Sequence, residues 1–408
     1  MHVLYFHQHF TTPRGSGGTR SYEMARGLLA DGHTVTMVCG SSKQGHTGLS
    51  IPFNRGRRRG MVEGIDIVEF DLPYGNEIGF VRRSWLFLWF ALVSVGFALR
   101  ERCDCVFATS TPLTAGIPGI FARWLRRKPF VFEVRDLWPE LPRAMGVITN
   151  PIVLSAMSLL EWVSYRSADR CIGLAPGIVE GITRRGVPPR RVAMIPNGCD
   201  LSLFGNQLKA WRPEGVANED LLAVYCGTHG IANGLDAVLD AAAILMRQNR
   251  RDIHMVLIGT GREKGRLVER AQAEGLENVH FLDAVPKQRL VGLLAGADVG
   301  MQTLQNVRAF YYGTSPNKFF DYLAAGLPVL INYPGWVASL VQEYDFGFAV
   351  EPGRPDVFAA ALEAAAADKT ELRKKGERAR CLATEQFDRA QLARNWTQWV
   401  TSGVALEK

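Results

Sequence analysis

The chain has 408 residues, of which 47% are hydrophobic and 21% are charged, and its mean hydropathy is -0.01. This length suits two domains that each bury a core, and the composition excludes a disordered, fibrous or integral membrane protein. The net charge of +7 arises in the first half, because residues 1–200 hold 24 Lys and Arg against 16 Asp and Glu. A basic half can bind nucleic acid, an anionic membrane surface or phosphorylated substrates.

The seven cysteines are scattered along the chain without a CxxC pair. This spacing supports neither a zinc site nor a disulfide framework, so we expect buried, reduced thiols. The first ten residues, MHVLYFHQHF, lack the basic start, apolar run and cleavage site of a signal peptide. Both patterns predict a cytosolic protein.

The first half alternates short apolar runs with longer amphipathic ones. Residues 2–6 predict a buried strand, residues 21–32 a helix and residues 33–39 the next strand, which is an opening typical of a parallel sheet. Further strands, separated by helical segments, are expected at residues 105–110, 129–134 and 170–175. The first half therefore predicts one doubly wound α/β domain.

The loop GSGGTR, residues 15–20, joins the first strand to the first helix. It is not the dinucleotide fingerprint, which would need a glycine in place of Arg20. Gly17 and Gly18 still allow the backbone to approach a phosphate at the helix start, so they are candidate ligand residues. The alternative is a tight structural turn.

Residues 82–102, RRSWLFLWFALVSVGFALRER, combine an apolar stretch with arginines at both ends. The apolar core, residues 85–99, has 15 residues and is shorter than the roughly 20 that a spanning helix needs. Apolar and cationic groups together predict docking on an anionic leaflet, whereas a buried core helix would explain the apolar run but not the arginines. Other basic residues of the first half that we group with this stretch are Arg55, Arg57, Arg58, Arg59 and those of RWLRRK, residues 123–128.

Residues 133–140, EVRDLWPE, place Arg135 and Asp136 directly after a predicted strand. Open parallel sheets bind ligands at the carboxyl ends of their strands, so Asp136 is the leading polar candidate for the reacting centre. The alternative is a salt bridge at the strand end, with Trp138 in the core.

The pattern of strands and helices restarts in the second half. Strands are expected at residues 221–227, 253–261, 278–285, 297–304 and 327–332, and a helix at residues 234–248. The sequence therefore predicts two Rossmann-type domains in tandem. They are joined near residues 192–204, where Pro196, Asn197 and Gly198 favour a turn. We predict domains at 1–195 and 196–385, and a C-terminal helix at 386–408 that packs on its own domain or back on the first one.

Residues 315–331, SPNKFFDYLAAGLPVLI, predict a helix that stops at Gly-Leu-Pro and continues as an apolar strand. Ser315 is a good N-cap, and Pro316 fits the first turn. The free N–H groups and the positive dipole end there suit a phosphate, and Lys318 adds a full charge. Asp321 lies one turn further, on the same side as Asn317 and Lys318, where its carboxylate can accept from a ribose diol. The alternative is a capped surface helix with an ion pair between Lys318 and Asp321.

This stretch resembles the donor-binding signature of the retaining glycosyltransferases of family 4, in which an acidic residue precedes a helix ending in Ala-Ala-Gly-x-Pro-Val. Other stretches match at the corresponding places: residues 15–39, EVRDLWPE, RVAMIPNGCDLSLF at 191–204 and VYCGTHGIANGLD at 224–236. The resemblance covers nearly the whole chain and is greatest to the WbuB-like branch, which builds bacterial surface polysaccharides such as O-antigen. It implies the GT-B fold, in which two Rossmann-like α/β domains face each other across a cleft, the first binding the acceptor at the membrane and the second the nucleotide sugar.

The resemblance also implies roles for single residues. Asp321 matches the acid that binds the nucleotide ribose, and residues 315–318 match the turn around the diphosphate and the sugar. Gly313 is a departure, because many members carry a second glutamate at that position. The contact to the donor sugar must then come from elsewhere.

The loop after the first strand of the second domain departs as well. Many members have an Arg and a Lys there to neutralise the diphosphate, whereas this chain has Thr228, His229 and Asn233. Neutralisation would then fall to Lys318, to backbone N–H groups and to Arg262 or Lys264. The expected donor-binding residues are Gly17, Gly18, Thr228, Asn233, Arg262, Lys264, Val285, Ser315, Pro316, Asn317, Lys318 and Asp321, and the expected catalytic residues are Asp136, His229 and Lys318.

From the resemblance we expect an enzyme that moves a sugar, with retention, from a nucleotide sugar to a lipid-linked or saccharide acceptor. The family branch implies a UDP-sugar. No carboxylate is placed as a covalent nucleophile, which favours front-face departure, with the leaving diphosphate helping to deprotonate the acceptor. Asp136 and His229 would position the sugar and the acceptor, while Lys318 stabilises the charge that grows on the diphosphate.

No cofactor and no metal are expected, because no Asp-x-Asp pair follows a strand and the eight histidines do not form a ligand set. We expect the enzyme to be peripheral on the inner face of the cell membrane, with no nucleic-acid partner. One alternative is a nucleotide-sugar epimerase or a glycogen-synthase-like enzyme on the same fold. A nucleic-acid-binding protein is the other, and it is disfavoured because the arginines alternate with apolar runs rather than exposed aromatic residues.

Overall fold

The computed structural model describes residues 1–15, 17–42, 45–75, 78–205 and 209–405. These residues fold as two compact units, each built around its own sheet. The first unit comprises Met1–Pro196, Gly313–Ser315 and the chain from Ala390 onward. The second comprises Asn197–Tyr312 and Pro316–Arg389.

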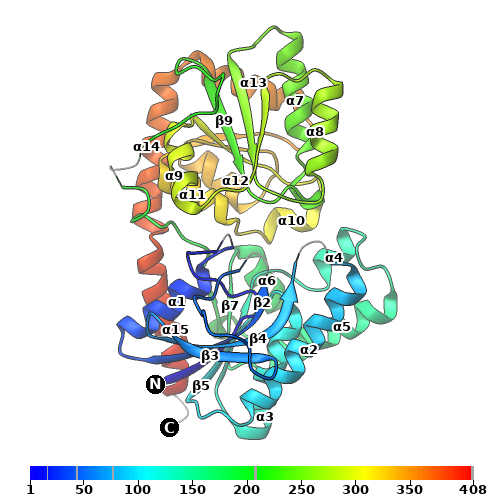
Figure 1. Cartoon of the computed structure of the whole chain (residues 1–408), viewed down its shortest axis with the longest axis vertical. Helices are drawn as coiled ribbons and strands as arrows, with labels where there is room; N and C mark the ends of the chain where they lie inside the picture. Colours follow the sequence, from blue (N-terminus) through cyan, green and yellow to red (C-terminus); the bar gives the residue numbers. More distant parts are fainter. Residues whose placement is uncertain (16, 43–44, 76–77, 206–208, 406–408) are drawn as a thin grey trace. The chain divides into compact units, whose positions relative to one another are not determined.

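Within the described residues, the first unit holds an eight-stranded sheet in the order β3-β4-β2-β1-β5-β6-β7-β8 (Figure 1). Neighbouring strands are parallel, except that β3 and β4 are antiparallel. The strands are β1 (His2–Phe6), β2 (Thr34–Ser42), β3 (Arg57–Val62), β4 (Ile65–Tyr74), β5 (Cys105–Thr109), β6 (Phe130–Val134), β7 (Arg170–Gly173) and β8 (Val192–Met194).

Helices cover both faces of this sheet. The connections β4-α2-β5, β5-α3-β6 and β6-α5-β7 advance in one direction along the strand order, and β1-α1-β2 runs in the other. Because crossovers between parallel strands are right-handed, α2, α3 and α5 lie on one face and α1 on the opposite face. The helices are α1 (Arg20–Ala30), α2 (Phe80–Ala98), η1 (Leu113–Gly116), α3 (Ile117–Arg126), α4 (Glu140–Ala144), α5 (Pro151–Ser167), α6 (Pro176–Arg184) and η2 (Pro189–Arg191).

The strands predicted in the first half are present as β1, β2, β5, β6 and β7, but the sequence did not predict the hairpin of β3 and β4. Every second residue of β3 is exposed, which fits an edge strand. Arg58 forms an ion pair with Glu69 at 2.8 Å, and Arg59 forms one with Asp66 at 2.6 Å. Grouping these two arginines with a membrane-directed cluster was therefore wrong, because carboxylates of this unit already bind them.

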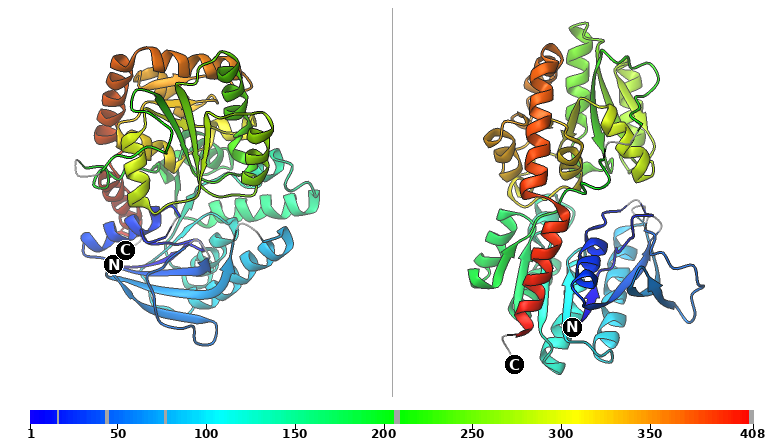
Figure 2. Two further views of the ribbon diagram at one scale, coloured as in Figure 1. Left: turned by 45° about the horizontal axis from the view of Figure 1, so that its top comes forward. Right: turned by 90° about the vertical axis from the view of Figure 1, so that its left-hand side faces the viewer.

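The chain returns to the first unit as α15 (Arg389–Ala405), which packs against α1. A Cβ on Gly27 of α1 would lie 3.2 Å from the Cβ of Ala393, so the close approach of the two helices depends on this glycine. Trp396 is fully buried, and its ring stacks on that of Tyr5 in β1 with 5.8 Å between centroids. Figure 2 shows α15, in red, beside the blue start of the chain.

In the described part of the second unit, six parallel strands form a sheet in the order β11-β10-β9-β12-β13-β14. The strands are β9 (Leu221–Cys226), β10 (Ile253–Ile258), β11 (Val279–Leu282), β12 (Val299–Gln302), β13 (Val329–Ile331) and β14 (Gly347–Ala349). The helices are η3 (Ile231–Asn233), α7 (Asp236–Arg247), α8 (Lys264–Ala273), α9 (Lys287–Gly296), α10 (Arg308–Tyr312), α11 (Asn317–Ala325), α12 (Trp336–Glu343), α13 (Pro355–Ala367) and α14 (Lys369–Gln386).

Strand β9 shows why the periodicity could be recognised in the sequence. All six of its residues are buried, and they alternate between the cores on the two faces of the sheet. An unbroken apolar run of this length is typical of a parallel strand that is covered on both sides. The predicted architecture of two doubly wound α/β domains is confirmed. Six cysteines are buried as expected, but Cys381 on α14 is exposed, and the prediction is wrong for that residue.

Candidate functional site

The carboxyl edge of the second sheet brings together most of the predicted site residues. The loop after β9 carries Thr228, His229 and Asn233, and the loop after β10 carries Arg262. Val285 follows β11, and α11 supplies residues 317–321. The strand order reverses between β9 and β12, which makes this edge a topological switch point, where open parallel sheets bind ligands.

Helix α11 begins one residue later than predicted. Its N-cap is Pro316, with an extended backbone, and its first helical residue is Asn317. The prediction of Ser315 as N-cap was wrong, because Pro316 has an extended backbone, with a ψ of 127°, and is itself the last residue before the helix. The helix ends at Gly326, whose φ of 69° is left-handed, as the Gly-Leu-Pro sequence predicts. The N–H groups of the first turn still face outward from the helix start and carry its positive dipole end.

Lys318 is half-buried beside the loop after β9. Its Nζ donates to Tyr225 Oη at 3.0 Å and to Asn233 Oδ1 at 3.3 Å. In the part of the chain that the structure describes, no carboxylate pairs with this ammonium, and burial lowers its pKa to about 8. A Cβ on Gly227 would lie 3.0 Å from Lys318 Cε, so the glycine leaves room for the lysine. An uncompensated cation of this kind is suited to an anionic ligand.

Asp321 does not pair with Lys318, so the alternative of an ion pair within α11 is wrong. Its Oδ2 instead accepts from Lys287 Nζ at 2.6 Å. Lys287 begins α9, just after β11, and it was not among the residues predicted for the site. Because a carboxylate has about four acceptor positions, this pair leaves Asp321 able to accept from hydroxyl groups.

The loop after β9 is held by its own hydrogen bonds. The Thr228 carbonyl accepts from Tyr225 Oη and from Asn233 Nδ2, both at 2.9 Å. His229 donates its backbone N–H to Thr260, and its own carbonyl accepts from Glu263. These bonds fix Asn233 against Lys318.

The His229 side chain is fully buried, and its ring nitrogens have no hydrogen-bond partner among the described residues. Burial, together with the charges of Lys264 and Lys318, lowers its pKa to about 4, so the ring is neutral at pH 7. This placement does not fit the predicted role of His229 in positioning the sugar and the acceptor. Its backbone anchors the loop instead.

The two cations suggested as substitutes for the missing Arg and Lys differ. Lys264 Nζ donates to the carbonyls of Gly259 and Leu282 and to Asp283 Oδ1, at 2.6 to 3.1 Å. These bonds use all three of its donors, so the expectation that Lys264 neutralises a diphosphate does not fit. Arg262 is exposed and makes no hydrogen bond or ion pair within the described ranges, which leaves it available.

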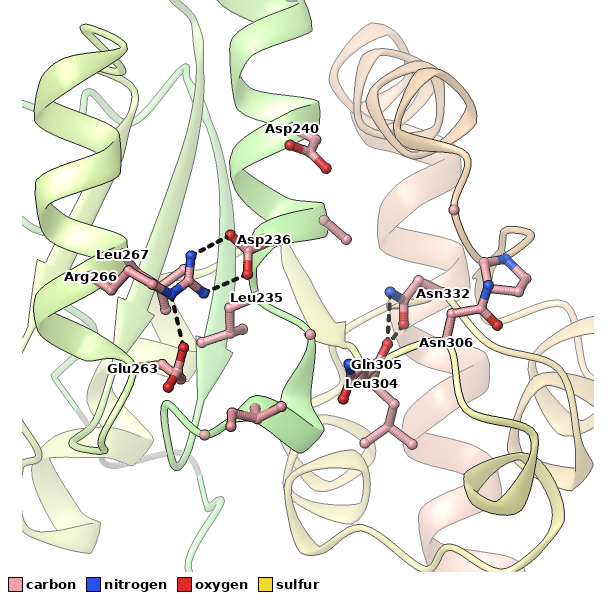
Figure 3. A pocket seen from close by; sticks show the side chains of 16 residues that line it. Leu235, Asp236, Asp240, Glu263, Arg266, Leu267, Leu304, Gln305, Asn306 and Asn332 are labelled. Carbon is pink, nitrogen blue, oxygen red and sulfur yellow. Dashed lines mark hydrogen bonds and ion pairs between the residues drawn. The ribbon is translucent and has the colours of Figure 1, made fainter. Parts of the chain in front are cut away.

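A cavity of about 280 Å³ lies at the same sheet edge, between the loops after β9 and β12. Its lining is rich in acids, and Figure 3 shows Arg266 paired with Asp236 and Glu263. Asp240 pairs with Arg270 at 2.5 Å. The lining has three acids and one arginine, and all four are paired within the protein, so the cavity offers no unpaired cation to a diphosphate. The sequence had not suggested any of these charged residues.

The first unit has its own polar group of residues at the carboxyl end of its sheet. Asp136 follows β6, its Oδ2 accepts from Thr111 Oγ1 at 3.2 Å, and burial raises its pKa. Arg135 donates to Thr109 Oγ1 and lies 3.4 Å from Glu133 Oε1. The strand-end salt bridge therefore involves Glu133, and Asp136 remains a candidate for contact with substrate.

A buried ion pair also lies at this edge of the first sheet, and it was not predicted from the sequence. Arg20, the last residue of the glycine loop, lies 2.8 Å from Glu133, and both side chains are almost completely buried. Burial raises the pKa of Glu133, but Arg20 and Arg135 outweigh that effect and hold it below the ordinary value. Gly17 and Gly18 are exposed just before α1, on the first unit with Asp136, and Ser16 of the same loop lies outside the described residues.

Two glycosyltransferase family models match the chain, one in each half. Residues 15–198 match the model of the glycosyl transferase 4-like domain, and residues 209–381 match that of the glycosyl transferases group 1. D-inositol 3-phosphate glycosyltransferase of Nocardia farcinica is 28% identical over 204 residues, which are 48% of this chain and 44% of the relative. The match therefore spans less than half of that relative's length.

Several solved structures share the fold over almost their whole length. Sucrose-phosphate synthase of Thermosynechococcus elongatus has a TM-score of 0.76 at 16% identity, covering 99% of both chains. Anabaena HepE in complex with UDP has 0.67 at 17% identity, covering 98% of this chain and 100% of that one. WaaG, which is involved in lipopolysaccharide biosynthesis, has 0.70 at 16% identity, covering 98% and 99%.

Proposed function

The chain belongs to the GT-B glycosyltransferases of family 4 type, and we propose that it transfers a sugar from a UDP-sugar to a lipid-linked saccharide with retention of configuration. The acceptor would be an intermediate of a bacterial surface polysaccharide. HepE was solved with UDP, and this supports the choice of nucleotide.

The observation that carries the proposal is Lys318 at the start of α11. Its ammonium is half-buried, lies beside Asn233 and Tyr225, and has no carboxylate partner in the described chain. A diphosphate bound there would meet a full positive charge, the N–H groups of the first turn and the helix dipole. Arg262 is the second available cation at this edge and replaces Lys264 in our assignment.

The nucleoside would extend from the diphosphate toward Asp321 and Val285. Asp321 keeps free acceptor capacity after pairing with Lys287, so it can bind the ribose diol. Val285 follows β11 and is half-buried, so it offers backbone groups and an apolar surface to the base. Lys287 would hold the carboxylate in place.

In the transfer, the bond between the sugar C1 and the diphosphate oxygen breaks while the acceptor oxygen bonds to C1 on the same face. The acceptor proton passes to the leaving diphosphate oxygen. Lys318 and the N–H groups stabilise the growing negative charge, without a resident metal ion. Asp136, on the first unit, would orient a hydroxyl of the sugar or the acceptor, and Thr111 holds its carboxylate.

Thermal shift with UDP and a panel of UDP-sugars tests the donor site, because a ligand that binds only the folded state raises its stability. Wild type should be stabilised, Lys318→Met should not, and Lys374→Met should behave as wild type. Lys374 is the matched control, since its side chain is 61% exposed on α14. Stabilisation of Lys318→Met equal to that of wild type would contradict the assignment.

Transfer itself is tested with a radiolabelled UDP-sugar and a lipid extract that contains polyprenyl-linked saccharides. We expect label in the organic phase, undiminished by EDTA. Conversion of the UDP-sugar to an epimer in the absence of any acceptor would instead favour an epimerase.

A further inference from the structure

Three helices on one face of the first unit's sheet form a continuous layer. Arg126 of α3 donates to the carbonyl of Ala98, the last residue of α2, at 2.8 Å. Trp124 of α3 donates to Ser167 Oγ, at the end of α5, at 2.9 Å. Helix α3 therefore joins α2 to α5, and Figure 1 shows the three helices on the same side of the sheet.

Helix α2 has two apolar sides, of which only one is buried. Leu86, Phe90 and Ala98 recur at helical spacing and pack into the unit. The opposite stripe is also apolar but faces solvent, and Trp85 and Leu92 within it are 59% and 60% exposed. A surface helix of a water-soluble unit ordinarily carries polar residues on that side.

The outward sides of α3 and α5 continue this apolar surface. Leu125 of α3 is 65% exposed, and Ile152 of α5 is 77% exposed. We call the combined surface the three-helix face, and its exposed apolar residues are Val81, Trp85, Leu88, Trp89 and Leu92 on α2, Phe121, Trp124 and Leu125 on α3, and Ile152, Val153, Leu159 and Trp162 on α5. An exposed patch shared by three elements marks an interaction surface.

The charge on the same helices identifies the kind of partner. Together they contain five arginines, of which Arg123 is paired with Asp169 at 2.8 Å, and one acidic residue, Glu161. Glu161 is buried and paired with Arg185 at 2.5 Å, so it does not offset the positive charge at the surface. Arg82 and Arg166 are exposed, Arg82 directly after Val81 and Arg166 one helical turn after Trp162. Basic groups beside exposed tryptophans suit the headgroup region of an anionic bilayer.

Helix α2 is suited to lie on the bilayer rather than to cross it. Within the described residues, Val81–Ala98 is the one helix that is long and apolar enough to span a membrane. Its inner side, however, is part of the fold, since Phe90 and Ser94 are fully buried and the Phe87 carbonyl accepts from Thr114. If α2 crossed the membrane, these contacts with the rest of the unit would be lost. Partial insertion of its outer stripe into the bilayer surface would leave them intact.

We propose that the three-helix face docks the first unit on the surface of a bilayer that contains anionic phospholipid. The apolar residues enter the boundary of headgroups and acyl chains, and the flanking arginines bind lipid phosphates. Docking would bring the enzyme to a lipid-linked acceptor, and only this consequence rests on the proposed function. Arg58 and Arg59 do not contribute, because Glu69 and Asp66 already pair with them.

Co-sedimentation of the full chain with vesicles tests this surface. One set of vesicles is phosphatidylcholine alone, and the other is equal parts of phosphatidylcholine and phosphatidylglycerol. The apolar variant is Trp85→Ser/Leu92→Ser/Leu125→Ser, and the charge variant is Arg82→Gln/Arg166→Gln. The matched control is Ile51→Ser/Met61→Ser, which removes two exposed apolar side chains of the same unit outside the face.

We expect wild type and the control to bind the anionic vesicles, and the apolar variant to bind more than about tenfold more weakly. The charge variant should lose about fivefold for each arginine, the factor equivalent to the ~1 kcal/mol that a basic group contributes near an anionic surface. Stabilisation by UDP should be the same in all four proteins. Equal stabilisation shows that each variant is folded, and it separates the test of the three-helix face from the test of the donor site.

Two results would overturn the inference. One is that the apolar variant binds anionic vesicles as well as wild type does. The other is that wild type does not bind them at low salt, and in that case we would ask whether wild type forms a dimer that the apolar variant loses. If it does, the face would be an interface between two copies of the chain.

Discussion

Raising the pH should weaken UDP binding through Lys318. Burial lowers the pKa of this ammonium to about 8, from an ordinary value of 10.5. At pH 9 only about a tenth of the unliganded protein would carry the charge, so the apparent Kd should be roughly tenfold larger than at pH 7, equivalent to ~1.4 kcal/mol. The diphosphate has already lost its last proton in this range, since the final ionisation of a phosphate lies near pH ~6.

Isothermal titration calorimetry in two buffers of different ionisation enthalpy measures both the Kd and the protons taken up. Near pH 8.5 we expect net uptake of protons when UDP binds to wild type. Lys318→Arg is the control, because its guanidinium stays charged and its Kd should change little, while any ionisation of UDP itself affects both proteins equally. A wild-type Kd that is constant from pH 7 to 9, or that changes as in Lys318→Arg, would refute the role of Lys318.

The unliganded protein should show the opposite trend. Because the pKa of Lys318 in the folded chain lies below its ordinary value, unfolding takes up a proton between pH about 8 and 10.5. The contribution of Lys318 to the free energy of unfolding therefore rises across this window, and Lys318→Met should lack that rise. Denaturant unfolding of both proteins at several pH values measures the difference.

Three further substitutions separate the roles of single groups. Asp321→Ala should raise the Kd for UDP by more than about tenfold, since it removes a charge-assisted hydrogen bond, and Lys287→Met should raise it less; equal losses would assign both residues to support of the fold. Asp136→Asn should lower kcat far more than the affinity for the donor, and parallel losses in steady-state kinetics would indicate a structural role. Glu133→Gln leaves Arg20 buried without its partner and should lower the free energy of unfolding by about 3 kcal/mol in urea, with UDP affinity preserved; an unchanged midpoint would show that the pair is dispensable.

The fold was largely predictable because its signal is local. Parallel strands covered on both faces are near-continuous apolar runs, and β1, β5, β6, β9 and β10 each contain at most one His, Thr or Glu. The hairpin of β3 and β4 gave no such signal, since β3 is RRRGMV and lies at the sheet edge. Its arginines were misread as free cations because the carboxylates that bind them come from other segments of the chain.

The candidate site was predictable only in part for the same reason. The position of Lys318 at a helix start could be predicted from the motif, but its contact with Tyr225 could not, because Tyr225 belongs to a strand that reads as core. Lys287 follows a predicted strand at its carboxyl end, and that position was the signal that could have drawn attention to it. The His229 ring lies beside those of Tyr225 and Phe281, which belong to two different strands, and no local pattern reveals this packing.

The central claim is that the donor diphosphate binds at the start of α11. The most direct measurement is a crystal structure of the chain with UDP. Density for the two phosphates within hydrogen-bonding distance of Lys318 Nζ and of the first N–H groups of α11, with the ribose at Asp321, is the predicted result. Phosphate density elsewhere, with Lys318 still bound only to Tyr225 and Asn233, would contradict it.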